Sequence, residues 1–184
     1  MIRVTSGILK GRRFDVVGEA VRPTMESVRE AIFSSLGGTC KGLRVLDLYA
    51  GSGSLGLEAW SRGASEVVFV EEDQRTAKQL TDCIALFRCD ELAQASVHRA
   101  EALRWMQGAR GSFDLILADP PYDMPHALEQ TVSAVAANSL LREGGKLVYE
   151  LRASQPADIP AGWIVVREKK YGKTKVLTLM QEKR

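Results

Sequence analysis

The sequence predicts an α/β fold of the doubly wound, nucleotide-binding type, and three features carry this prediction. An apolar strand at residues 44–48 leads into a glycine-rich loop that begins at Gly51 and then into a helical pattern. A second strand, residues 67–70, ends at Glu71, and a third, residues 115–118 with Phe113 just before it, stops at a carboxylate followed by two prolines. Open α/β sheets bind ligands at the carboxyl ends of their strands, where all three features lie.

Length and composition are typical of one soluble domain. The chain has 184 residues, of which 45% are hydrophobic and 26% are charged. Its three cysteines lack metal-ligand spacing, and His98 and His126 are isolated, so we expect reduced thiols, no disulfide and no metal site. No apolar run has the length of a membrane span, and the first residues show no signal-peptide pattern. We therefore expect a cytoplasmic protein, and a monomer.

Charge is distributed unevenly along the chain. Residues 1–41 carry seven Lys or Arg against four Asp or Glu, and residues 163–184 carry seven against two. The middle of the chain, residues 42–162, carries eleven against seventeen. A polyanion would therefore meet the basic ends. An ordinary solvated surface is the alternative, and charge alone does not separate the two.

The chain begins with a predicted β-hairpin. Residues 3–8 and 12–17 have the pattern of two short strands joined across residues 9–11, which places Lys10, Arg12 and Arg13 at the tip of the hairpin. These side chains are candidate RNA contacts.

A helix follows the hairpin. Thr24 is a suitable N-cap, apolar residues recur at helical spacing as far as Leu36, and glycines from Gly37 end the helix. About forty residues are too few to fold alone. We therefore expect residues 1–38 to form an extension packed against a main domain of residues 39–184.

The glycine loop leaves two ligands to weigh. Gly51, Gly53 and Gly56 match the G-x-G-x-x-G pattern of NAD-binding enzymes. However, Asp47 lies at the end of the preceding strand, where a carboxylate disfavours a pyrophosphate but suits an amine and a sulfonium. Glu71 can accept both hydroxyls of an adenosine ribose. S-adenosylmethionine accounts for both carboxylates, whereas capping of loop N–H groups is a structural alternative for Asp47.

The turn Asp119-Pro120-Pro121-Tyr122 is the candidate catalytic element. Each proline fixes its own φ and lacks an N–H, and Asp119 is held extended by the proline that follows it. The turn therefore offers a carboxylate, bare carbonyl groups and an aromatic face, which together suit a planar group that carries an amine. A stiff loop exit with a surface tyrosine is the alternative.

The remaining elements continue the α/β alternation. A helix at residues 73–87 leads to a short strand at 96–98. The chain then crosses the sheet edge at residues 99–103, where Glu101 could accept from an adenine amino group and the Ala102 N–H could donate to the ring. We expect the later elements to be a helix at residues 126–137 and strands at 146–150, 164–169 and 176–180.

Several motifs resemble the RsmD family of bacterial methyltransferases. They are Ser6-Gly7 with Lys10-Gly11-Arg12, Arg22-Pro23-Thr24 with Val28-Arg29-Glu30-Ala31-Ile32-Phe33, Val45-Leu46-Asp47-Leu48-Tyr49-Ala50-Gly51-Ser52-Gly53, Asp119-Pro120-Pro121-Tyr122, and Lys170-Tyr171-Gly172. The resemblance implies a class I, Rossmann-like fold with a seven-stranded, mostly parallel sheet whose last strand is antiparallel. It also implies methylation of the exocyclic N2 of one guanosine in small-subunit (16S) ribosomal RNA, with S-adenosylmethionine as methyl donor.

Motifs and resemblance together define the expected site. The catalytic residues are Asp119, Pro120, Pro121 and Tyr122. The cofactor-binding residues are Asp47, Tyr49, Ala50, Gly51, Gly53, Glu71, Glu72, Glu101, Ala102 and Asp119. The RNA-binding residues are Lys10, Arg12, Arg13, Arg22, Lys170 and Lys173. Glu101 departs from the family pattern, in which Asp is common at the adenine-binding position.

Two alternatives remain at this point. An N6-adenine DNA methyltransferase would use the same Asp-Pro-Pro-Tyr turn, although the chain leaves no room for a separate target-recognition domain. A non-catalytic RNA-binding assembly factor would need only the basic ends, and it would have no use for Asp47, Glu71 and the turn.

Overall fold

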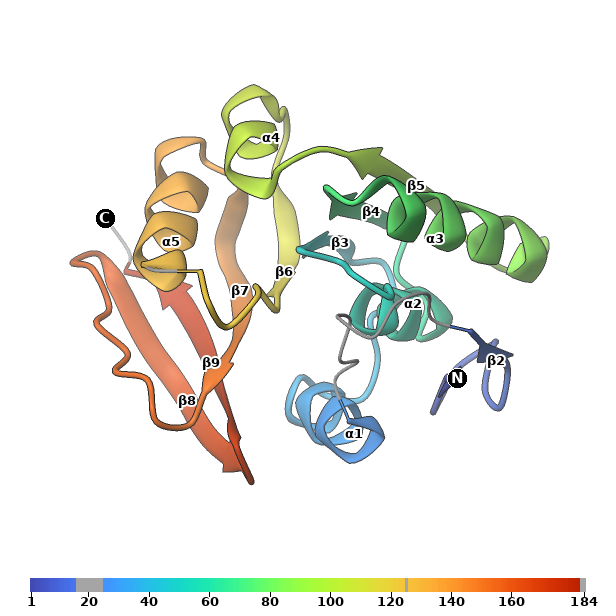
Figure 1. Ribbon diagram of the computed structural model, residues 1–184, viewed down its shortest axis with the longest axis horizontal. Helices are drawn as coiled ribbons and strands as arrows, with labels where there is room; N and C mark the ends of the chain where they lie inside the picture. The colour runs from blue at the N-terminus through green and yellow to red at the C-terminus, as the bar shows by residue number, and fades with distance from the viewer. Residues whose placement is uncertain (16–24, 125, 183–184) are drawn as a thin grey trace.

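The computed structural model describes residues 1–15, 25–124 and 126–182 (Figure 1). A seven-stranded sheet forms its centre. The strands in spatial order are β5 (Gln94–Arg99), β4 (Glu66–Glu71), β3 (Arg44–Leu48), β6 (Phe113–Ala118), β7 (Leu141–Arg152), β9 (Thr174–Gln181) and β8 (Trp163–Tyr171). The helices are α1 (Glu26–Ser35), α2 (Ser54–Ser61), α3 (Gln74–Phe87), α4 (Ala102–Gly108) and α5 (Ala127–Ala137).

The sheet has the predicted, mostly parallel topology. β3 pairs in parallel with β4 on one side and β6 on the other, β5 extends this parallel part beyond β4, and β7 extends it beyond β6. The last strand, β9, lies antiparallel between β7 and β8. This order confirms the Rossmann-like fold and the antiparallel last strand that the sequence predicted. It also places the carboxyl ends of β3, β4 and β6 side by side, and open parallel sheets bind ligands at these ends.

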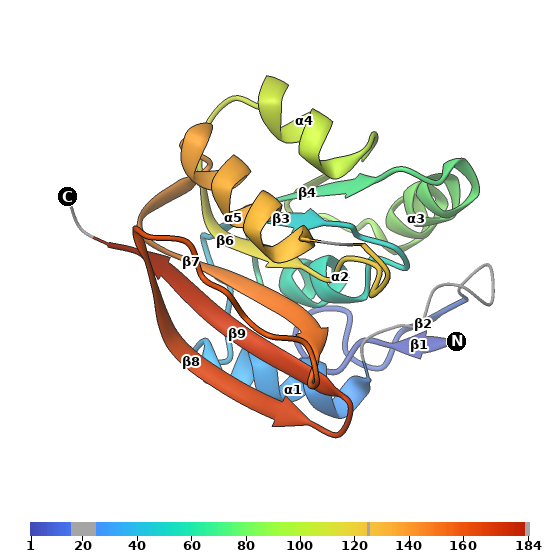
Figure 2. The ribbon, with the colours of Figure 1, turned by 60° about the vertical axis from the view of Figure 1, so that its left-hand side comes forward.

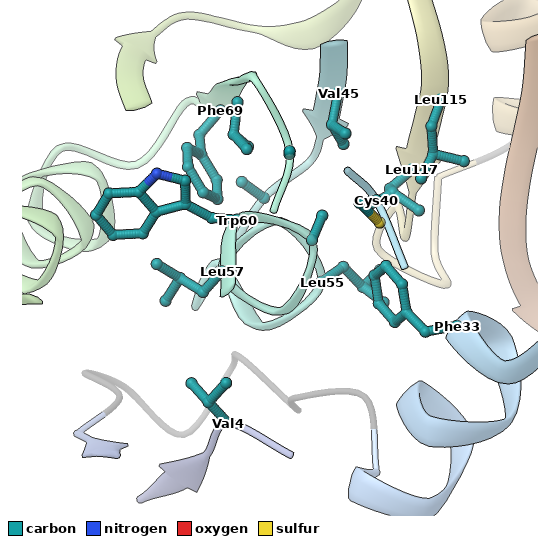
Figure 3. Packing of buried hydrophobic residues seen from close by; sticks show 14 of the residues in the cluster. Val4, Phe33, Cys40, Val45, Leu55, Leu57, Trp60, Phe69, Leu115 and Leu117 are labelled. Carbon is teal, nitrogen blue, oxygen red and sulfur yellow. The ribbon is translucent and has the colours of Figure 1, made fainter. Parts of the chain in front are cut away.

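Helices cover both faces of the sheet (Figures 1 and 2). Strand residues alternate between the faces. Val45 and Leu117 pack with α1, α2 and α3, whereas Leu46 and Ile116 pack with α4 and α5. Figure 3 shows the first of these cores, in which Trp60 of α2 lies beside the strand residue Phe69. Burial on both faces explains why these strands are nearly continuous apolar runs.

The N-terminal hairpin exists, but its strands are shorter than predicted. β1 (Ile2–Arg3) pairs with β2 (Arg13–Phe14), in place of strands at residues 3–8 and 12–17. The chain between them turns to meet the end of α2: the Ile8 N–H donates to the Ser61 carbonyl at 2.8 Å. Contacts with α2 therefore replace the expected ladder. Residues 16 and 17 lie outside the described part of the chain.

The first helix begins later than predicted. α1 starts at Glu26 with Met25 as its N-cap and no side-chain capping bond, whereas Thr24 was expected to cap it and lies outside the described residues. Its end is as predicted, because Gly37 and Gly38 have φ values of +100° and +78°. These left-handed values favour glycine.

Sequence reasoning missed α4 and shortened the last three strands. Glu101 is the N-cap of α4, and glutamate is not one of the preferred capping residues. β7 extends to Arg152 and β9 begins at Thr174 because their antiparallel pairing continues past the apolar residues. β7 also begins earlier than predicted, at Leu141, which pairs with Phe113 of β6. Within the described ranges, no helix combines the length and the apolarity that a membrane span requires.

Candidate active site

A cavity of about 420 Å³ opens at the carboxyl ends of the parallel strands. Its wall includes all four predicted catalytic residues and nine of the ten predicted cofactor residues; Gly53 is the exception. Residues from β3, β4, β6 and their following loops thus meet in one place although they are far apart in sequence. The topology is the cause, because parallel neighbours end at the same edge of the sheet.

Gly53 serves the packing of the loop. It is the N-cap of α2 with a φ of +74°, and a Cβ on it would lie 2.4 Å from the Leu80 Cδ1 of α3. Gly56 is similar, because its Cβ would lie 2.2 Å from the Phe69 ring. These two glycines therefore bring α2 close to its neighbours, while Gly51 lines the cavity.

Glu71 ties the end of β4 to the glycine loop. One carboxylate oxygen accepts from the Gly51 N–H at 2.8 Å, and the other accepts from the Asp73 N–H at 2.8 Å. Asp73 in turn caps α3 by accepting from the Thr76 N–H at 2.8 Å. These bonds fix the orientation of the Glu71 carboxylate at the cavity wall.

Asp47 is a buried carboxylate beneath the glycine loop. Its side chain is only 1% exposed and accepts from the Gly56 N–H at 2.8 Å. Burial raises the pKa of Asp47 well above its usual value; the bond from Gly56 opposes this, and the charges of Asp119 and Glu71 add to it. The capping role weighed for Asp47 is therefore real, and the same side chain also lines the cavity.

Glu101 caps a helix in the structure. Its two carboxylate oxygens accept from the Leu103 N–H at 2.9 Å and the Arg104 N–H at 2.7 Å, at the first turn of α4. Glu101 and Ala102 line the cavity next to this turn.

Tyr49 adopts a left-handed conformation, with a φ of +57°, at the end of β3. Its hydroxyl forms a 2.9 Å hydrogen bond with the Thr131 hydroxyl of α5. Burial raises the pKa of Tyr49, and this bond opposes the rise. The ring is therefore held between the loop and the helix.

The Asp119 turn borders the same cavity. The Tyr122 hydroxyl lies 3.3 Å from the Thr174 hydroxyl, at the start of β9. The Arg152 guanidinium sits 4.9 Å from the centroid of the Tyr122 ring. Contacts from two strands thus hold the tyrosine in position, which argues against a merely exposed side chain.

Sequence reasoning missed part of the wall. Met25 at the N-cap of α1, Val28 of α1, Glu150 of β7 and Thr174 of β9 also line the cavity. Only Glu150 had a usable signal, as a carboxylate at the end of a predicted strand. The other three reach the site through tertiary packing.

The predicted RNA contacts lie outside the cavity wall. Lys10, Arg12 and Arg13 are exposed on the hairpin, and Lys170 and Lys173 are exposed around the β8–β9 turn. Arg22 lies outside the described residues. The cavity and these basic side chains are therefore separate parts of the surface.

The charge of the cavity identifies the kind of ligand that it fits. Seven carboxylates line it: Asp47, Glu71, Glu72, Asp73, Glu101, Asp119 and Glu150. Among the described lining residues, none is Lys or Arg. Such a wall disfavours the pyrophosphate of NAD and suits a ligand that carries hydroxyls, an ammonium and a sulfonium. The residues present therefore fit S-adenosylmethionine.

Comparisons with known proteins find relatives along nearly the whole chain. The family model described as "Conserved hypothetical protein 95" matches residues 2–180. The chain is 33% identical over 174 residues to "Ribosomal RNA small subunit methyltransferase D" from Haemophilus influenzae, covering 93% of this chain and 89% of that protein. It is 34% identical over 180 residues to "Putative rRNA methyltransferase YlbH" from Bacillus subtilis, covering 95% and 96%.

A solved structure described as "Putative methyltransferase yhhF from Escherichia coli" superposes with a TM-score of 0.86 at 30% identity, covering 100% of this chain and 99% of that one. The family match and these relatives span nearly the whole chain. This chain therefore belongs to the family described as "Conserved hypothetical protein 95", the RsmD-like methyltransferases that depend on S-adenosylmethionine.

Proposed function

We propose that this protein methylates the exocyclic N2 of a guanosine in small-subunit (16S) ribosomal RNA. The observation that carries the proposal is the Asp119-Pro120-Pro121-Tyr122 turn on the wall of the acidic cavity. The printed names of the relatives support ribosomal RNA as the substrate class.

The turn suits the chemistry of a guanine amine. That amine is a weak nucleophile because its lone pair is delocalised into the ring. Asp119 and the Pro120 carbonyl accept its two N–H bonds, which favours a pyramidal nitrogen and frees the lone pair. S-adenosylmethionine supplies a methyl group that the sulfonium already activates. Positioning and electrostatic stabilisation by the turn therefore carry most of the rate.

The fate of the proton follows from the same arrangement. The N2 lone pair forms the new bond to the methyl carbon, and the carbon–sulfur pair leaves on sulfur. The nitrogen then holds two hydrogens and a positive charge, and one proton departs to Asp119 or to water. Asp119 is an acceptor throughout and need not act as a strong base.

Tyr122 provides the surface on which the base stacks. Its hydroxyl contact with Thr174 and the guanidinium of Arg152 hold the ring before any substrate arrives. A base taken out of its RNA context is stabilised by such a preformed aromatic face.

The cofactor roles follow the strand ends. Glu71 accepts the ribose hydroxyls with Glu72 beside it, and Asp47 lies towards the positively charged methionine part. Glu101 and Ala102 border the adenine. Tyr49, Ala50, Gly51 and Gly53 shape the loop beneath the ligand.

The basic side chains contact the RNA in this proposal. Lys10, Arg12, Arg13 and Arg22 belong to the extension of residues 1–38, and Lys170 and Lys173 belong to the methyltransferase domain of residues 39–184. Exposed cations of this kind bind phosphates without selecting a sequence.

The test is to identify the methylated nucleoside. The protein is incubated with labelled S-adenosylmethionine and, separately, with small-subunit rRNA, assembled small subunits and duplex DNA. We expect N2-methylguanosine in one or both of the ribosomal samples and no label in DNA. Label in N6-methyladenine of the DNA would support the adenine alternative. Binding of S-adenosylmethionine without transfer to any nucleic acid would support an assembly factor.

A further inference from the structure

Glu150 is a buried carboxylate in the wall between two cavities. Its side chain is 3% exposed at the end of β7. It lines the cofactor cavity and also a second cavity of about 380 Å³. The residues that line both cavities also include Pro120, Pro121, Tyr122 and Met124. This junction borders the Asp119 turn, on which the proposed function places the base.

The sheet register aligns Glu150 with Asp119. β6 and β7 are parallel, and Ala118 pairs with Tyr149, so the residues that come next are Glu150 on β7 and Asp119, which directly follows the end of β6. Neighbouring strands lie about 4.8 Å apart. Ala118 and Tyr149 pack into the core beneath α4 and α5, so the pleat turns Asp119 and Glu150 towards the opposite face and the cavity.

A buried cation stands near Glu150 on the same side of the sheet. Arg29 of α1 is 2% exposed, and burial lowers the pKa of its guanidinium. The negative charges of Glu58, Glu26 and Glu150, in decreasing order of effect, raise the pKa of Arg29 and so oppose the effect of burial. Arg29 therefore places a positive charge near the Glu150 carboxylate, whose oxygens accept hydrogen bonds.

We propose that Glu150 selects guanine by accepting its N1–H, while the Asp119 turn accepts the two N2–H bonds. The inference rests on the proposed function and adds the residue that chooses the base. A carboxylate oxygen is an acceptor that matches the N1–H donor of guanine. Adenine has a lone pair at N1 in place of this donor. Its N1 would therefore face the carboxylate oxygen as a second acceptor, and no hydrogen bond could form. Glu150 is therefore a specificity-determining residue for this reaction.

The experiment varies the N1 position of the substrate. The nucleotide that the wild-type protein methylates in small-subunit rRNA is first located by mass spectrometry. Ligated rRNAs then carry either guanosine or 2-aminopurine riboside at that position. 2-Aminopurine keeps the N2 amine but has an acceptor at N1. The kcat/KM values of the wild type, Glu150→Gln and Glu150→Ala are compared on both RNAs.

We expect the wild type to prefer guanosine, and we expect Glu150→Ala to reduce that preference by about 10- to 100-fold, as for loss of one hydrogen bond to a charged acceptor. Glu150→Gln should raise the relative rate on 2-aminopurine, because its amide NH₂ can donate to N1. The ratio between the two RNAs cancels any general loss of stability or of cofactor binding.

Glu143→Gln is the matched control, because it removes a carboxylate from the other end of β7, where the side chain is exposed. Its guanosine to 2-aminopurine ratio should equal that of the wild type. A wild-type ratio in both Glu150 variants, with N2-methylguanosine still formed, would overturn the role of Glu150 alone. Methylation of adenine in place of guanine by the wild type would overturn the proposed function as well.

Discussion

The carboxylate of Glu71 accepts the backbone N–H of Gly51 at 2.8 Å and so joins the end of β4 to the loop after β3. The same carboxylate accepts the Asp73 N–H at the start of the next helical segment. One side chain therefore organises two of the loops that border the cavity. A change at Glu71 should disturb both the shape of the loop and its contact with the ribose.

Glu71→Ala should weaken S-adenosylmethionine binding by about 1–3 kcal/mol, because the acceptor for the ribose hydroxyls is lost. Titration calorimetry measures the change. Asp82→Ala, an exposed carboxylate on α3, is the control and should bind like the wild type. Unchanged affinity in Glu71→Ala would move the ribose contact to another carboxylate of the wall.

Asp119→Ala should lower kcat by roughly 10²–10³-fold, the usual cost of one lost transition-state acceptor. Cofactor affinity should change little, because the Glu71 contact remains. Single-turnover methylation and calorimetry together separate the two effects. Asp123→Ala, an exposed carboxylate on the same loop, is the control. Near wild-type turnover in Asp119→Ala would exclude the turn as the catalytic element.

Asp47→Asn should increase stability most at high pH. The pKa of Asp47 is raised on folding, so its contribution to stability is fully present below the unfolded value of about 3.9 and is lost as the pH rises through the folded pKa. Asparagine keeps an acceptor for the Gly56 N–H and does not titrate. The Tm advantage of Asp47→Asn over the wild type should therefore grow from pH 4 to pH 8.

Asp90→Asn, on an exposed loop, should show no such trend in Tm. Cofactor binding should weaken in Asp47→Asn, because the negative charge that faces the methionine part is removed. A Tm difference that shrinks as the pH rises would contradict the pKa direction assigned to Asp47.

Gly7→Ala should destabilise the docked hairpin much more than Gly11→Ala. Both glycines have φ values near +84°, so each substitution carries a similar backbone strain of about 1–3 kcal/mol. Only at Gly7 would the new Cβ meet another atom, the Ser61 carbonyl oxygen at 1.8 Å, whereas nothing lies within 4 Å at Gly11. Urea unfolding of the two variants isolates the cost of this steric overlap. Equal losses would mean that the hairpin does not pack on α2 in solution.

Neutralising Lys10, Arg12 and Arg13 together should raise KM for RNA and flatten its dependence on salt. Each lost phosphate contact reduces the slope of log affinity against log salt by about 0.7–0.9. The control is the exposed triple Lys41→Ala, Arg88→Ala and Arg110→Ala, which removes the same charge elsewhere. Its dependence on salt should stay steeper than that of the hairpin triple. Cofactor affinity should be unaffected in both. Equal slopes in the two triples would show that the hairpin charges are ordinary solvated surface.

Local sequence signals were sufficient for the centre of the fold. β3 lies at the predicted residues 44–48, and β6 (Phe113–Ala118) contains the predicted strand at residues 115–118 together with Phe113 before it. Apolar runs of this length are recognisable because both faces of each strand are buried, and the glycine loop and the proline pair mark where the strands end. The carboxylates Asp47, Glu71 and Asp119 were therefore identifiable from their places directly at strand ends.

The tertiary structure alone decided which other residues meet these carboxylates. Nothing in the sequence near Met25, Val28 or Thr174 indicates a place in the cavity wall, because pairing of β9 with β7 and packing of α1 bring them there. The hairpin likewise exchanges its ladder for bonds to Ser61. Local patterns record which backbone each segment prefers, whereas contacts between distant segments depend on how the whole sheet closes its two cores.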